Sequence, residues 1–219
     1  MVQSFRFRHL LILMAIFILI LIGVRIYVTG SIIHLFLVWN IFLAWIPYAL
    51  SGFLEYRATS PQRISSWILF FTWLVFFPNA LYLVTDLIHL QDTAGAPIWY
   101  DAMLLFTAAL LGLMLAFASL YHVERWFQSF VSAGKLAILM PFIMALSAFG
   151  VYLGRFDRWN SWDILHDPVA LCNSILRYVW NPVDHAYTWG ITGLFAVFYY
   201  LMYLLSRWMW HGRQSEIES

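Results

Sequence analysis

The chain has 219 residues, of which 63% are hydrophobic, 20% aromatic and 11% charged, with a formal net charge of +1 at pH 7. Soluble domains carry about 25% charged residues, so this composition excludes an ordinary water-soluble globule and predicts a protein solvated mostly by the lipid bilayer. The small net charge argues against a nucleic-acid partner, because no basic face is large enough to neutralise a row of phosphates. The single cysteine, Cys172, excludes an internal disulfide.

Six apolar stretches are long enough to cross a bilayer, for which a helix needs about 20 residues. They cover residues 10–28, 32–54, 66–90, 101–121, 136–153 and 186–208. We therefore predict an all-α membrane protein, a six-transmembrane-helix bundle that forms a single domain over 1–219. The first stretch ends at Gly23-Val24-Arg25, a poor cleavage site, so we interpret it as a retained helix and not as a signal peptide.

Lysine and arginine residues near the ends of the stretches predict the orientation. With the N-terminus inside, eight basic residues lie on the inner side, namely Arg6, Arg8, Arg57, Arg63, Arg125, Lys135, Arg207 and Arg213. Four lie on the outer side, namely Arg25, Arg155, Arg158 and Arg177. The outer side also receives seven aspartates: Asp86, Asp92, Asp101, Asp157, Asp163, Asp167 and Asp184. We expect an inner-membrane protein with both termini in the cytoplasm.

Polar residues gather along one side of the third stretch. Asn79, Tyr82, Asp86 and His89 follow steps of three, four and three residues, which place them on one face of an α-helix. Pro78 precedes Asn79 and removes one backbone hydrogen bond, so polar groups freed at this depth need partners or water, and a cavity is expected. In the alternative interpretation, Asn79 and Asp86 bond across helices and only hold the bundle together.

The pattern Asp-x-x-His occurs twice, at Asp86–His89 and at Asp163–His166. As a metal site, Asp86, His89, Asp163 and His166 would supply two nitrogens and two carboxylate oxygens to zinc or manganese. The preferred assignment contains no metal: His89 acts as a general base oriented by Asp86, and Arg155 stabilises a developing anion. No cofactor follows from the residues.

Residues 154–185 are predicted to form an outer segment that contains one additional interfacial helix. Asp167-Pro168 has the form of a helix start. Five apolar residues of the helix would then share one face, which suits a helix lying in the outer interface: Val169, Cys172, Ile175, Leu176 and Val179. Arg155 and Arg158 either neutralise the outer acids, with Arg155 turned back to Asp86, or one of them binds an anionic head group.

Three further polar residues receive structural interpretations. Asp101 stands at the start of the fourth stretch, where a carboxylate is expected to cap the helix. His34 could join the outer polar layer, although a lone histidine at this place is more often a membrane-interface residue. Asn40 is interpreted as a packing amide in the second stretch.

Two longer motifs resemble those of a known family. The segments FFPNALYLVTDLIHL (76–90) and YLGRFDRWNSWDIL (152–165) are similar to the bacterial integral membrane family called domain of unknown function 1361. The matching positions are Pro78, Asn79, Tyr82, Thr85, Asp86, His89, Gly154, Arg155, Arg158, Asn160, Ser161, Trp162 and Asp163. The resemblance implies a multipass helical bundle and supplies no established activity.

The predicted site is an outward-facing pocket with two groups of residues. The candidate catalytic residues are Asp86, His89, Arg155 and Asp163, and the candidate binding residues are Asn79, Tyr82, Arg158 and Asn160. We expect this pocket to bind or modify a small polar or lipid-linked anionic molecule. Two alternatives stay open. A transporter would need polar residues continuing into the inner half, and a structural or partner-binding subunit would use the same residues as a self-satisfied network.

Overall fold

The computed structural model describes residues 2–56, 63–91 and 95–215. Its elements are α1 (Val2–Thr29), α2 (Phe36–Tyr56), α3 (Ile64–Tyr82), the 3-10 helix η1 (Leu83–Gln91), α4 (Ile98–Gln128), α5 (Ala133–Phe156), α6 (Asp163–His166), α7 (Pro168–Trp180) and α8 (Ala186–Ser215). These ranges contain no β-strand, which confirms the all-α prediction. Arg57 and Asp92, which entered the orientation argument, lie outside the described residues.

Six helical segments in the described ranges are long and apolar enough to cross a membrane. They are Phe7–Thr29, Phe36–Tyr56, Ile64–Leu90, Ile98–Gln128, Ala133–Phe156 and Ala186–Met209. Each overlaps one predicted stretch, so the six-span prediction is confirmed. The fourth segment extends past the predicted end at residue 121, and the extension contains the buried carboxylate of Glu124, which is paired with Arg207.

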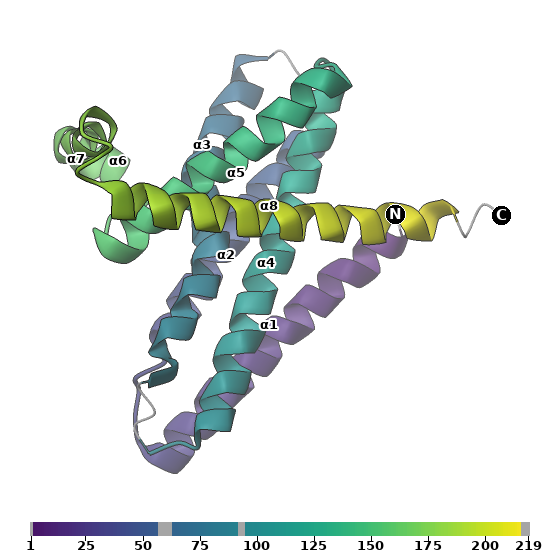
Figure 1. Cartoon of the computed structure of the whole chain (residues 1–219). Helices are drawn as coiled ribbons and strands as arrows, with labels where there is room; N and C mark the ends of the chain where they lie inside the picture. Colours follow the sequence, from purple (N-terminus) through teal and green to yellow (C-terminus); the bar gives the residue numbers. More distant parts are fainter. Residues whose placement is uncertain (1, 57–62, 92–94, 216–219) are drawn as a thin grey trace.

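The long helices pack around α4. Helix α2 packs against both α3 and α4, while α1 packs against α4. In Figure 1, α2, α3 and α4 run lengthwise beside one another, and α8 crosses in front of them at a wide angle. Helix α5 packs against α3 and α8, and α6 and α7 follow its C-terminal end. The core between the helices is rich in aromatic rings, with Trp73 and Trp126 both fully buried and Phe70 stacked on each of them.

The third span is not a single α-helix, which corrects the prediction for 66–90. It changes to 3-10 winding after Tyr82, where the Thr85 hydroxyl donates to the Tyr82 carbonyl at 2.6 Å. Such local side-chain bonds compete with α-helical ones, and Pro78 has already removed a donor one turn earlier. In a 3-10 helix residues three apart are eclipsed, so Asp86 and His89 stand on the same side of η1.

Two glycines let neighbouring helices approach the end of α3 closely. A Cβ added at Gly112 of α4 would stand 2.5 Å from the carbonyl oxygen of Ala80, and one at Gly150 of α5 would stand 2.7 Å from Cγ of Pro78. The backbone of α3 around Asn79 is therefore held between α4 and α5. This packing positions the polar residues that follow.

Candidate functional site

Arg155 of α5 forms an ion pair with Asp86 of η1. The Arg155 Nη2 group donates to Oδ1 of Asp86, and its Nε group donates to the Thr85 hydroxyl at 2.9 Å. The Asp86 side chain is only 1% exposed and that of Arg155 is 12% exposed. Of the two interpretations of Arg155, the structure shows the one in which it turns back to meet Asp86.

Three other residues complete this network from other parts of the chain. Asn40 of α2 donates through Nδ2 to Oδ2 of Asp86 at 2.9 Å. The Arg155 guanidinium lies over the Tyr82 ring, with Cζ 4.1 Å from the ring centroid, and its Nη1 is 3.4 Å from Nε2 of His89. The charges of the pair compensate each other, and the contacts join α2, α3, η1 and α5. Removing one partner of such a buried pair costs about 3–5 kcal/mol, because the other charge is left without compensation.

A cavity of about 210 Å³ lies beside this network, between α2, α3, α5, α6 and α7. Its polar and aromatic lining residues are Trp39, Asn40, Asn79, Tyr82, Trp159, Asn160 and Ser161. No charged side chain lines it in the described part of the chain. Asn40 and Tyr82 belong both to the cavity wall and to the ion-pair network, whereas Asp86, His89 and Arg155 contribute only to the network.

Asn79 and Ser161 close one side of the cavity. The Nδ2 group of Asn79 donates to the Ser161 hydroxyl at 2.8 Å and to the Phe76 carbonyl at 2.9 Å. The Ser161 hydroxyl donates in turn to the Val75 carbonyl at 3.0 Å. The loop before α6 is thereby tied to the proline-containing end of α3, where carbonyl groups need donors.

The second Asp-x-x-His copy has a different role from the first. Oδ2 of Asp163 accepts from the backbone N–H of Asn160 at 2.7 Å and from its Nδ2 at 3.3 Å, so this carboxylate orders the turn before α6. His166 and Arg158 are both exposed, and Arg158 forms no ion pair with a described residue. Of the second motif, the fold brings Arg155 into the network and Asn160 to the cavity, while Arg158, Asp163 and His166 do not line the cavity. Asp163 is bonded to Asn160 of the cavity wall, and the charge of Arg158 acts on Tyr82 through space.

The alternative metal site is not assembled. Among the residues that the structure describes, no group of three or more His, Cys, Asp or Glu side chains lies close enough to hold a metal ion. Asp86 and His89 face Arg155, whereas Asp163 is bonded to its own turn and His166 is exposed. The two copies are separated because η1 belongs to the bundle and α6 belongs to the segment that covers the cavity.

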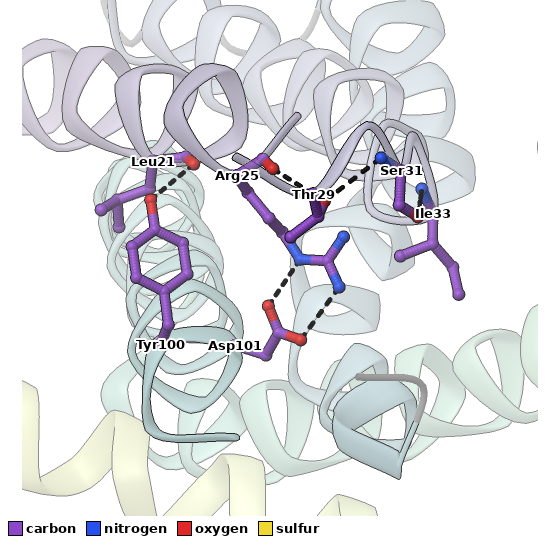
Figure 2. Close-up of polar contacts among 7 residues, drawn as sticks. All are labelled: Leu21, Arg25, Thr29, Ser31, Ile33, Tyr100 and Asp101. Carbon is purple, nitrogen blue, oxygen red and sulfur yellow. Dashed lines mark hydrogen bonds and ion pairs between the residues drawn. The ribbon is translucent and has the colours of Figure 1, made fainter. Parts of the chain in front are cut away.

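Asp101 does not cap α4, which corrects its predicted role. Figure 2 shows its carboxylate facing the Arg25 guanidinium of α1, with Nε to Oδ1 at 2.6 Å and Nη2 to Oδ2 at 3.0 Å. Both side chains are essentially buried, at 1% and 0% exposure. The neighbouring Tyr100 hydroxyl donates to the Leu21 carbonyl at 2.7 Å. A bidentate pair uses both carboxylate oxygens, so Asp101 joins α1 to α4 and leaves the α4 N-terminus without a side-chain cap.

His34 is buried, whereas the sequence placed it at the interface. Its side chain lies in the α1–α2 connection, and neither ring nitrogen has a hydrogen-bond partner among the described residues. Burial lowers the pKa of His34 below its ordinary value, and the positive charge of Arg25 lowers it further. The neutral imidazole is therefore the form that the fold favours.

A second buried carboxylate lies at the opposite end of α4. Glu124 pairs with Arg207 at 2.8 Å, accepts from the Tyr203 hydroxyl, and accepts from Nε2 of Gln128 at 3.3 Å. A cavity of about 420 Å³ adjoins this group between α4, α5 and α8. The contacts saturate the carboxylate and join α4 to α8.

Ser51, His122 and Glu55 form a linear array near this end. The Ser51 hydroxyl is 3.2 Å from Nδ1 of His122, and Nε2 of His122 is 3.5 Å from Glu55. The order is that of a nucleophile, a base and an orienting acid. Ser51 is fully buried, however, and donates to the Tyr48 carbonyl, so the array links α2 to α4 and offers no accessible nucleophile.

The sequence interpretation missed Asn40 and Trp39 as site residues. A lone amide within an apolar helix needs a partner, and this was the available signal. The partner, Asp86, is 46 residues away, so it became evident only from the packing of α2 against η1. Trp39 contributes an aromatic wall that no local pattern distinguishes from a lipid-facing tryptophan.

A comparison with protein families gives one match, which covers most of the chain. The family described as Protein of unknown function (DUF1361) matches residues 39–202. The matched region contains both long motifs, the Arg155–Asp86 pair and the residues that line the cavity. No curated protein and no solved structure matches the chain. The chain therefore belongs to the family Protein of unknown function (DUF1361).

Proposed function

We propose that the protein binds a small polar molecule, or the polar head of a lipid, in the cavity between α2, α3, α5, α6 and α7. The observation that carries the proposal is the convergence of amide and hydroxyl groups from Asn40, Asn79, Tyr82, Asn160 and Ser161 on one space with otherwise apolar walls. Sites for small molecules usually have this form, with apolar and aromatic walls and a few polar groups that fix the orientation of the ligand.

We place this cavity on the extracytoplasmic side of an inner membrane, with both termini in the cytoplasm. The distribution of lysine and arginine supports this orientation. Helix α7 beside the cavity buries Tyr178 and exposes Val169, Leu176 and Val179, as expected for a helix that lies in the membrane interface. Its predicted start is also present, since Asp167 accepts from the Ala170 N–H at 3.1 Å.

The proposal concerns binding and not chemical modification. Arg155, which suggested an anionic ligand, is compensated by Asp86, and His89 faces Arg155 and the Phe36 ring. None of these three charged or titratable side chains lines the cavity. We assign to them the task of holding the cavity wall, through Asn40 and Tyr82. A purely structural subunit would need the network alone, and the cavity beside it is what favours a binding protein.

A pair of neighbouring substitutions on α6 tests the proposal. Ile164 lines the cavity and is 44% exposed, so Ile164→Trp adds bulk to the cavity from its outer wall. Leu165 is 87% exposed and does not line the cavity, so Leu165→Trp is the matched control. The proteins are extracted without detergent and loaded into nanodiscs containing equal parts of dioleoyl phosphatidylethanolamine, phosphatidic acid and glucosyl diacylglycerol.

The readout has two arms, one for each source of ligand. Native mass spectrometry counts the lipids that the released protein retains, and thermal shifts measure stabilisation by ethanolamine, inorganic phosphate and methyl glucoside. We expect at least one probe to bind the parent and Leu165→Trp but not Ile164→Trp. If no probe distinguishes Ile164→Trp from its control, the cavity is not a binding site for such molecules and the proposal fails.

A further inference from the structure

We infer that the ligand of this cavity is an uncharged, hydroxyl-rich group, such as a sugar or polyol head. The inference rests on the proposed function and narrows its ligand class. It departs from the anionic ligand expected from the sequence, and three features of the lining support it.

The first feature is the absence of compensating charge. No lining residue in the described part of the chain is acidic or basic. The guanidinium of Arg155 lies over the Tyr82 ring and is bonded to Asp86 and Thr85, and Arg158, whose charge acts on Tyr82 through space, is exposed and does not line the cavity. A charged ligand entering this space would lose hydration without gaining an opposite charge, which is far more costly than burying a hydroxyl that finds a hydrogen bond.

The second feature is that hydrogen bonds fix the orientation of the three cavity asparagine amides. The Nδ2 groups of Asn40 and Asn160 donate to the carboxylates of Asp86 and Asp163, and that of Asn79 donates to a backbone carbonyl. Carboxylates and carbonyls only accept, so these bonds fix which end of each amide is the nitrogen. The amide oxygens are therefore left to accept hydrogen bonds from a ligand.

The third feature is the combination of a hydroxyl with aromatic walls. The Tyr82 hydroxyl has no hydrogen-bond partner among the described residues and can donate or accept. Trp39 and Trp159 add flat apolar surface. Their negative ring faces suit the polarised C–H groups of a sugar ring, while the amide oxygens suit its hydroxyl hydrogens. Phosphate and carboxylate groups only accept hydrogen bonds, so they could use the donors of the lining but would leave its amide oxygens unpaired.

The nanodisc and thermal-shift experiment above decides between ligand classes when the probes are compared with one another. Alkyl glycoside detergents are excluded throughout, because their sugar heads would occupy the site. We expect glucosyl diacylglycerol, or methyl glucoside if the ligand is soluble, to bind about tenfold better than the ammonium and phosphate probes, a difference equivalent to about one good hydrogen bond. The arm that responds identifies whether the source is a lipid or a free molecule.

Tyr82→Phe is the second variant, because it removes the unpartnered hydroxyl and keeps the ring beneath Arg155. It should weaken glucoside binding by about tenfold without loss of thermal stability. The inference is overturned if the protein prefers a phosphate or ammonium probe (phosphatidic acid, phosphate, phosphatidylethanolamine or ethanolamine), or if it binds all probes equally. In either case an effect of Ile164→Trp would still support the proposed binding function. A lack of any Ile164→Trp effect would remove both.

Discussion

Gly150 of α5 lies directly against the ring of Pro78 in α3. The contact brings α5 close to the point where α3 loses its α-helical winding. Arg155 follows Gly150 by five residues, so this approach is what carries its guanidinium to Asp86 in η1. One residue without a side chain thus sets the distance across which the buried ion pair forms.

Gly150→Ala tests this relationship. The new methyl group would stand 2.7 Å from Cγ of Pro78, in a rigid ring that cannot move aside. Overpacking of this kind costs roughly 1–3 kcal/mol, against a helix-propensity gain of about 1 kcal/mol, so we expect a lower thermal unfolding midpoint. Gly134→Ala, in the same helix with nothing within 4 Å, should not destabilise. Equal midpoints for the two variants would show that α5 is free to shift.

The Arg155–Asp86 pair can be measured by a double-mutant cycle. Arg155→Met and Asp86→Leu each leave one buried charge without its partner, and each should destabilise the protein by about 3–5 kcal/mol. The double variant removes both charges and should be more stable than either single variant. The measurement is the unfolding midpoint in one detergent. Additive losses would mean that the two side chains are stabilised independently.

The sequence predicted features that depend on local pattern or on strong electrostatics. Hydrophobic length located the six spans, and Asp167-Pro168 located the start of α7. Opposite charge suggested the Arg155–Asp86 contact as one of two interpretations, and the structure shows this one. Features set by a distant partner were missed. Asp101 has the local signals of a helix cap, and only the position of α1 shows that Arg25 takes its carboxylate instead.

The change of winding at Tyr82 was missed for a related reason. Proline predicts a lost hydrogen bond but not how the chain continues afterwards. The outcome depends on which helices press against the segment, and here Gly112 and Gly150 allow α4 and α5 to do so. The same packing converts a predicted face of Asn79, Tyr82, Asp86 and His89 into two functions, a cavity wall and an ion-pair network.

The Ser119 hydroxyl of α4 bridges α2 and α3, and its removal should lower the stability of the fold. Its hydroxyl accepts from Nε1 of Trp73 at 2.6 Å and donates to the Pro47 carbonyl at 3.0 Å. Ser119→Ala leaves a buried donor unsatisfied, which costs about 1–3 kcal/mol. Ser147 is equally buried but donates only within its own helix, to Ile143, so Ser147→Ala is the control and should change the unfolding midpoint little. Equal effects would indicate that Trp73 finds another acceptor.

The folding stability of the protein should decrease as the pH is lowered, because His34 becomes protonated. The pKa of His34 is lowered from its ordinary value of 6.5 by burial and then by the charge of Arg25. The charge of Asp101 opposes this shift, and His89 acts both ways, because its charge lowers the pKa of His34 and its backbone raises it. The unfolded chain therefore binds the proton first. The stabilising contribution is complete above the unfolded value of 6.5 and is lost as pH falls toward the lowered folded value, by at most about 1.4 kcal/mol per pH unit.

The variant His34→Phe removes this titration. Between about pH 7.5 and about pH 5 its thermal unfolding midpoint should therefore decrease less than that of the parent. His166→Gln, at an exposed position on α6, is the control for losing any histidine. If the parent and His34→Phe decline in parallel, the acid sensitivity arises elsewhere and His34 is not the group that the fold keeps neutral.

The proposed orientation can be tested with single cysteines in a Cys172→Ser background. Asp184 and Ser129 are both exposed and lie in the connections before α8 and after α4, so each substitution to cysteine should leave the fold intact. With the cavity on the extracytoplasmic side, a membrane-impermeant maleimide should label Asp184→Cys on intact cells, and Ser129→Cys only after permeabilisation. The reverse pattern would place the cavity at the cytoplasmic surface, and its ligand would then come from the cell interior. Either result is physically possible, because the same apolar helices can span in both directions and the distribution of lysine and arginine selects between them.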